Sequence, residues 1–162
     1  MFTSRPSKSQ TLTLATEAIG NASVLASLLQ YISENHDSTQ WRAAWVIEKV
    51  ALKRPDLLIN ERNNLIHLAM HPDTPNGLRR LLLTTLHHLP DTEELDIAFL
   101  NFLLEQMVSL QSPPGVQSIA MKLAERISRS EPSLHDEFRC IVRNMELSYY
   151  SSAIRSVAKR YI

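Results

Sequence analysis

Large apolar residues recur every three or four positions along almost the whole chain, which is the spacing of one face of an α-helix. No segment alternates apolar and polar residues as a half-buried strand does, and only three glycines are present. Prolines and short polar stretches divide the periodic run into about nine segments. The pattern therefore predicts an all-α fold with helices over 11–19, 22–32, 41–53, 55–70, 75–89, 93–110, 116–129, 132–145 and 150–161.

Two stretches of this pattern align when their prolines are superposed. Residues 46–57 and 123–134 carry apolar, small, acidic and basic residues at matching positions, and Pro55 and Pro132 then open the following helix. Residues 81–90 form a looser copy between them, which also ends in a proline turn. The implied period is close to 40 residues. In repeats of that length, each helix pair leaves an apolar face that the next pair covers.

The first of these copies also resembles a known class of repeat. The run Arg42-Ala43-Ala44-Trp45, followed by the stop Lys53-Arg54-Pro55, is similar to a helix of the small single-domain HEAT-like proteins of bacteria. The resemblance to the HEAT/armadillo type covers nearly everything after about Thr11. It implies a right-handed α-α superhelix of HEAT-like helix pairs with a scaffold or interaction role.

Composition and charge narrow the class of protein further. We expect residues 1–9 to be a flexible lead-in and residues 10–162 to form a single repeat domain. Seventeen basic residues balance seventeen acidic ones, which argues against a dedicated nucleic-acid binder. The N-terminal segment has no apolar core of a signal peptide, and polar residues interrupt the longest apolar run, 95–110, so we expect no membrane span. A lone cysteine, Cys140, favours a reducing, cytoplasmic setting.

Catalytic and metal-binding patterns are missing from the sequence. With three glycines the chain has no glycine-rich phosphate loop and no GxSxG turn. His67 and His71 have a spacing that can share a metal, but Leu68 stands where a metalloprotease helix has glutamate, and no third ligand is nearby. We expect Cys140 to be a partly buried, inert thiol. The sequence therefore predicts no enzyme, no metal and no cofactor.

Aromatic and basic side chains gather on the helix over 41–53. On a helical wheel Arg42, Lys49 and Lys53 form its polar stripe, and a neighbouring flank carries Trp41, Trp45, Glu48 and Leu52. One interpretation is a patch that holds an extended peptide or a nucleic-acid backbone. The other is that the tryptophans fill space between helices and the basic stripe is merely solvated. We favour the second interpretation because tryptophans are usually well buried.

The leading hypothesis is a non-enzymatic protein- or peptide-binding module that uses the inner helix layer of a short superhelix. That layer would contain the helices over 41–53, 78–89, 116–129 and 150–161. The candidate contact residues are Arg42, Trp45, Glu48, Lys49, Lys53 and Arg79, of which we expect Arg42 and Arg79 to be exposed.

Two other hypotheses stay open. The first is a HEAT-like DNA-binding protein of the DNA-repair glycosylase type, which needs an exposed tryptophan and a carboxylate on a positive concave face. The second is a purely structural domain that dimerises through a superhelix end, so we expect a monomer or a weak homodimer.

Overall fold

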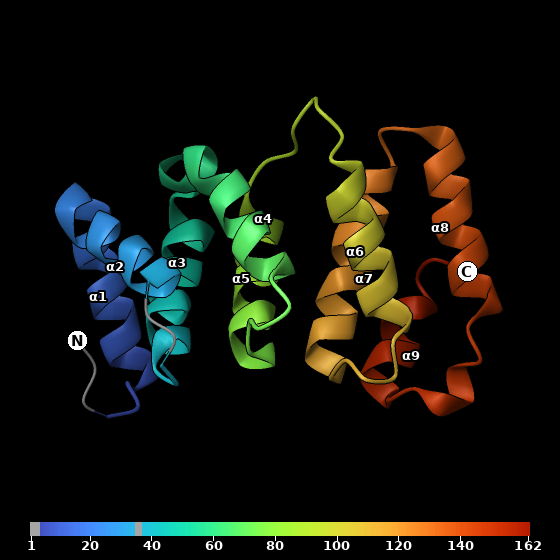
Figure 1. The fold of residues 1–162 in the computed structure, drawn as a ribbon, viewed down its shortest axis with the longest axis horizontal. Coiled ribbons are helices and arrows are strands. Elements are labelled where there is room, and N and C mark those ends of the chain that lie inside the picture. Colours follow the sequence, from blue (N-terminus) through green and yellow to red (C-terminus); the bar gives the residue numbers. More distant parts are fainter. Residues whose placement is uncertain (1–3, 35–36) are drawn as a thin grey trace. The chain divides into compact units, whose positions relative to one another are not determined.

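The structure is a computed structural model that describes residues 4–34 and 37–162. Over these residues it contains nine α-helices, two 3-10 helices and no strand, which confirms the predicted all-α fold (Figure 1). Each predicted helix corresponds to one observed α-helix. The chain divides into two compact units, Met1–Pro90 and Asp91–Ile162. The single domain and the right hand of the superhelix stay predictions.

The first unit is built around one central helix. Its elements are α1 (Lys8–Gly20), α2 (Ala22–Glu34), α3 (Gln40–Lys53), η1 (Pro55–Glu61), α4 (Arg62–Met70) and α5 (Asn76–His88). Helix α3 packs against α1, α2, η1 and α5. Helices α1, α3 and α5 therefore form one layer of this unit, while α2 and α4 pack behind them in a second layer.

Small and branched side chains allow α3 to take this central position. Six of its residues are at most 1% exposed: Ala43, Ala44, Val46, Ile47, Val50 and Ala51. The alanines let neighbouring helix backbones approach closely, and the branched residues fill the space between them. A helix that is apolar over so much of its circumference packs on several sides, as the sequence predicts.

The second unit repeats this plan. Its elements are α6 (Ile97–Val108), α7 (Pro114–Ser128), α8 (Pro132–Asn144), η2 (Leu147–Tyr149) and α9 (Ser152–Ala158). Helix α7 packs against α6, α8 and α9, so it holds in this unit the place that α3 holds in the first. Helices α7 and α9 share one layer, as predicted.

The first helix begins earlier than the sequence pattern predicts. Ser7 and Gln10 form a capping box: the Gln10 amide nitrogen donates to the Ser7 hydroxyl at 3.1 Å, and the Ser7 amide donates to the Gln10 side chain at 2.8 Å. Helix α1 therefore starts at Lys8, and the preceding Pro6 is buried. The predicted flexible lead-in is wrong for residues 7–9, which form the cap and the start of α1. Residues 1–3 lie outside the described residues.

Two other boundaries also differ from the prediction. Helix α6 begins at Ile97 because the carboxylate of Asp96 caps it, accepting from the Phe99 amide at 2.9 Å. The segment 55–70 is a 3-10 helix that passes into α4 at Arg62. Apolar periodicity located these helices, but it does not report which polar residue satisfies the first amides of a helix.

A buried polar side chain ties each of the helices α3, α5 and α7 to the helix before it. Each donates to the carbonyl oxygen eight residues earlier: Gln40 to Ile32 at 3.0 Å, Arg79 to His71 at 2.8 Å and Gln117 to Ser109 at 2.8 Å. We call these three residues the latch residues. They are 39 and 38 residues apart, which confirms a period close to 40.

The latch residues fix the register between the copies. Pro55 lies fifteen residues after Gln40, and Pro132 lies fifteen residues after Gln117. The predicted alignment of residues 46–57 with 123–134 has the same offset and is confirmed, and the latch residues extend the first copy back to Gln40 and the last copy back to Gln117. Pro90 follows Arg79 by only eleven residues. The proline of the middle copy therefore comes about one helical turn early, and aligning that copy by its proline was wrong.

Among the described helices, none alone has the length and apolar content needed to cross a bilayer. Helices α1 and α2 reach that length and hydropathy only as a pair, across a bend of 119°.

Candidate binding face of helix α3

One side of α3 is only partly covered by the surrounding chain. We call this side the α3 face; its residues are Trp41, Arg42, Trp45, Lys49, Leu52 and Lys53. At 3.6 residues per turn they lie within an arc of roughly 120°. Leu52 is 56% exposed, Lys53 is exposed and the others are half-buried. The arc has an apolar half, which holds the tryptophans and the leucine, and a basic half.

The two tryptophans lie close together at the start of the helix. Their ring centroids are 6.4 Å apart and the ring planes are tilted by 31°. The guanidinium carbons of Arg5 and Arg42 lie 5.9 and 5.7 Å from the Trp41 ring centroid. Such cation–π contacts contribute about 0.5–1 kcal/mol each at exposed sites. They place two guanidinium groups beside the apolar half of the face.

Glu48 is a buried bridge between α3 and α5. Its carboxylate contacts the Lys49 ammonium at 2.9 Å and the His88 Nε2 at 2.9 Å. The Glu48 side chain is only 8% exposed, so it presents no carboxylate on the surface. Including Glu48 among the surface contact residues was wrong, because its partner His88 lies forty residues away and is not visible in the local pattern.

Arg79 is also buried, against the expectation that it is exposed. It is 8% exposed, and its Nε donates to the Ala69 carbonyl at 2.9 Å, in addition to the latch bond to His71. Burial lowers the pKa of its guanidinium below the ordinary arginine value. The last carbonyls of α4 have no partner inside that helix, and the forked guanidinium satisfies two of them. Arg79 therefore holds the fold together.

The structure brings four of the six predicted contact residues together on the α3 face. Arg42 and Trp45 are half-buried there, and Lys49 is half-buried beside Glu48. Lys53 is exposed, and within the described residues no carboxylate lies at ion-pair distance from it. Leu52 and Arg5 join the face although neither was predicted as a contact. Leu52 lies on the same flank of the helical wheel as the tryptophans, so the sequence pattern could have identified it. Arg5 lies in the predicted lead-in, where no pattern indicated a contact.

The remaining reactive side chains do not assemble a second site. Within residues 4–34 and 37–162, no group of three or more His, Cys, Asp or Glu could hold a metal ion. The His71 Nδ1 instead accepts from the Asp73 amide at 3.2 Å. Cys140 is exposed, so its predicted partial burial was wrong. Cys140 lies two positions from the buried Phe138, and two positions rotate a side chain by about 200° around a helix.

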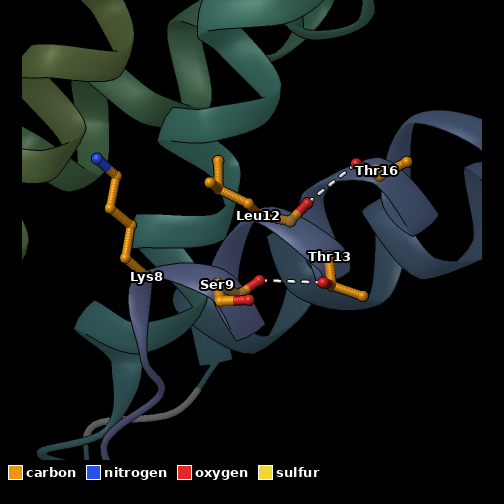
Figure 2. A pocket seen from close by; sticks show the side chains of 5 residues that line it. All are labelled: Lys8, Ser9, Leu12, Thr13 and Thr16. Atoms are coloured by element: carbon orange, nitrogen blue, oxygen red, sulfur yellow. Dashed lines mark hydrogen bonds between the residues drawn. The ribbon is translucent and has the colours of Figure 1, made fainter.

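Helix α1 carries a shallow, open depression on its outer side. Figure 2 shows the five residues that line it, all from this one helix: Lys8, Ser9, Leu12, Thr13 and Thr16. The hydroxyls of Thr13 and Thr16 donate to backbone carbonyls one turn earlier, at 3.0 Å each. The threonine donors are thus already used within the helix, and the depression has no convergent polar groups of the kind that define a small-molecule pocket.

Helix pairs that recur about every 40 residues, with a latch residue in α3, α5 and α7, define an all-helical repeat protein. A family model described as a HEAT repeat domain matches residues 1–162, and the chain belongs to this family. HEAT repeats form non-enzymatic scaffolds that commonly mediate protein interactions. No curated protein and no solved structure matches the chain.

Proposed function

We propose that the chain is a protein-binding module that holds a peptide, or the surface of a partner protein, on the α3 face. The main support comes from a comparison within the chain itself. The latch residues align each position of the first copy with a position in the last copy, so α7 serves as an internal control for α3.

Most buried positions of α3 are also buried at the equivalent position of α7. Ala43 and Ala120 are equivalent, and both are 0% exposed. The exposed and half-buried positions differ: Trp41, Trp45 and Leu52 of the α3 face correspond to Ser118, Lys122 and Arg129 of α7. The repeat therefore folds with polar residues at these three positions. Large apolar groups left partly in water, where the fold does not need them, are typical of an interaction surface.

The DNA-repair alternative has less support. It needs an accessible carboxylate among basic groups, and the only carboxylate on α3 is Glu48, which is buried between Lys49 and His88. The family comparison points to a scaffold and gives no glycosylase match. A monomer or weak homodimer in the cytoplasm completes the proposal.

Selection from a random peptide library tests the proposed function. The bait is the whole chain, and the counter-bait is the variant Trp41→Ser with Trp45→Lys, which copies the residues of α7. A matched control, Lys122→Ala, changes the equivalent position of the last copy. We expect enriched peptides to bind the wild type and the control but not the double variant, with circular dichroism showing that all three are folded. Enriched peptides that bind the double variant equally, or no enrichment at all, would contradict the proposal.

A further inference from the structure

We propose that the occupant of the α3 face is an acidic segment that carries large apolar side chains. This inference rests on the proposed function and adds the chemical class of the partner. Three observations support it: the charges of the face, its division into two parallel stripes, and the contrast with the equivalent face of α7.

The accessible charges of the α3 face are all positive. Arg42, Lys49 and Lys53 lie on the helix, and Arg5 lies over the Trp41 ring. Glu48 is the only acidic residue of α3, and its carboxylate is buried in contacts with Lys49 and His88. The whole chain has zero formal net charge, so this is a local concentration of positive charge. Such a patch attracts an acidic partner and disfavours a basic one.

The apolar and basic residues of the face form parallel stripes along the helix. The apolar stripe runs from Trp41 through Trp45 to Leu52, and the basic stripe runs from Arg42 through Lys49 to Lys53. At a rise of 1.5 Å per residue each stripe is roughly 15 Å long. A segment that matches both stripes needs apolar and acidic residues interspersed over about five extended residues or about ten helical ones.

Two arginines of the equivalent α7 face are paired with acidic side chains of the same unit. Arg126 forms an ion pair with Asp91, and Arg129 forms one with Glu125. Within the described residues, by contrast, no carboxylate lies at ion-pair distance from Lys53. The last copy thus pairs both arginines of this face within its own unit, whereas the first copy places the charge of Lys53 beside the exposed side chain of Leu52.

An acidic protein segment fits this face better than nucleic acid does. Single-stranded nucleic acid would stack its bases on the aromatic rings, but the guanidinium groups of Arg5 and Arg42 already lie over the Trp41 ring. Leu52, the most exposed apolar residue of the face, offers neither a stacking surface nor a phosphate contact. Leucine and tryptophan together favour apolar anchor side chains in the partner.

Fluorescence anisotropy with synthetic probes tests the inference. The first probe is a labelled peptide of about twelve residues that intersperses Asp and Glu with Leu and Phe. In two matched peptides, amides replace every carboxylate or Ser replaces every Leu and Phe. Single-stranded and duplex oligonucleotides of the same length form the nucleic-acid arm. We expect the acidic apolar peptide to bind, and each matched peptide and each oligonucleotide to bind at least about tenfold more weakly.

Variants of the protein locate the binding. Lys53→Glu reverses an exposed charge of the face, and we expect it to weaken the acidic peptide about tenfold at low salt. Lys122→Glu makes the same charge change on α7 and should alter binding less than about twofold. The inference is supported if Lys53→Glu weakens binding of the acidic peptide, Lys122→Glu does not, and the difference between the two variants becomes smaller at high salt. Equal effects of the two variants would overturn it.

The remaining outcomes separate this inference from the proposed function. The inference is overturned if the amide peptide binds as well as the acidic one, if an oligonucleotide binds more tightly, or if the acidic peptide does not bind up to about 1 mM. In each case the library selection still decides the proposed function. If the enriched peptides need Trp41 and Trp45 for binding but are not acidic, the proposed function holds and the partner belongs to a different chemical class.

Discussion

The first and last copies of the repeat differ on the surface far more than in the core. Gln40 and Gln117 make the same bond to a carbonyl eight residues earlier, and Pro55 and Pro132 follow at the same distance. On the exposed side, however, α3 presents two tryptophans and a leucine where α7 presents polar residues. The latch and the buried small residues are therefore sufficient for the repeat, and the exposed residues are free to serve a function.

The middle copy shows that the latch position tolerates a different side chain. Arg79 takes the place of the two glutamines and adds a second carbonyl, that of Ala69, to the one that each glutamine binds. The latch residue that makes the most hydrogen bonds, Arg79, should therefore contribute most to the free energy of unfolding. The following predictions test this ranking and the contrast between core and surface, beginning with the largest expected effect.

Replacing Arg79 by methionine should lower the free energy of unfolding by about 3 kcal/mol. The change keeps an unbranched apolar side chain but leaves the buried carbonyl of Ala69 without its side-chain donor. It also removes one of the two donors to the His71 carbonyl, which keeps the bond from the Thr74 amide. The relief of an unfavourably buried charge offsets part of the loss, because burial already lowers the pKa of this guanidinium. Urea denaturation followed by circular dichroism measures the difference.

The neighbouring Arg80 supplies the control for this variant. Arg80 is exposed on the same helix, so Arg80→Met should change stability by less than about 0.5 kcal/mol. Arg79→Lys should recover less than half of the loss, since one ammonium group cannot reproduce the fork. Equal costs for the two methionine variants would show that the latch does not stabilise the middle copy.

Replacing Gln117 by methionine should lower the free energy of unfolding by about 1 kcal/mol, because one part-buried hydrogen bond from its side chain to the Ser109 carbonyl is lost. Both tryptophans lie in the first unit, so their fluorescence reports unfolding of Met1–Pro90, whereas circular dichroism reports both units. If residues 10–162 form a single domain, the variant shifts the urea midpoint equally by both probes. A shift in circular dichroism alone would mean that the two units unfold independently.

Exchanging half-buried residues between the α3 and α7 faces should affect stability less than either latch variant. Trp45→Lys introduces the residue that α7 holds at the equivalent position, so we expect a loss of less than about 1 kcal/mol. The reverse change, Lys122→Trp, should also be tolerated. A loss as large as that of Arg79→Met would contradict the comparison, because the tryptophan would then be part of the core. Differential scanning calorimetry measures both variants.

The helices were predictable from the sequence because apolar periodicity is repeated many times along the chain. The latch was not recognised, since a single glutamine or arginine in a helix usually lies at the surface and carries no signal of burial. Its acceptors are backbone carbonyls, which no side-chain pattern reveals. The sequence does contain one signal of the latch: a proline follows each of Gln40 and Gln117 after the same number of residues.

The candidate site was predictable only in part. The helical wheel grouped Arg42, Lys49 and Lys53 beside the tryptophans, and the structure leaves this side of α3 only partly covered. The helical wheel could not show that the Glu48 carboxylate contacts His88, because His88 lies on a different helix of the layer. A helical wheel describes one helix in isolation, so it cannot predict which side chains form contacts with a neighbouring helix.

The smallest expected effect concerns the residues on either side of the two prolines. In the first copy Arg54 donates to the Asp56 carboxylate at 2.7 and 2.9 Å, whereas in the last copy the equivalent residues form a single contact, from the Ser133 hydroxyl to Glu131 at 3.2 Å. The hydrogen bond from Arg54 lowers the pKa of Asp56 below its ordinary value. The ionised carboxylate therefore stabilises the folded chain above the unfolded-state pKa of about 3.9, and this contribution is lost as the pH falls through the lower folded-state pKa.

Asp56→Asn should accordingly be slightly less stable than the wild type at neutral pH, and the difference should shrink as the pH falls through the lowered folded-state pKa of Asp56. Both side chains are solvent-exposed, so high salt should reduce the effect. Urea midpoints measured between neutral and acidic pH follow the difference. Arg54→Gln should remove the same pH-dependent part, and the double variant should add nothing to it. A difference that persists unchanged in acid would mean that Asp56 stabilises the start of η1 by a route other than the ion pair.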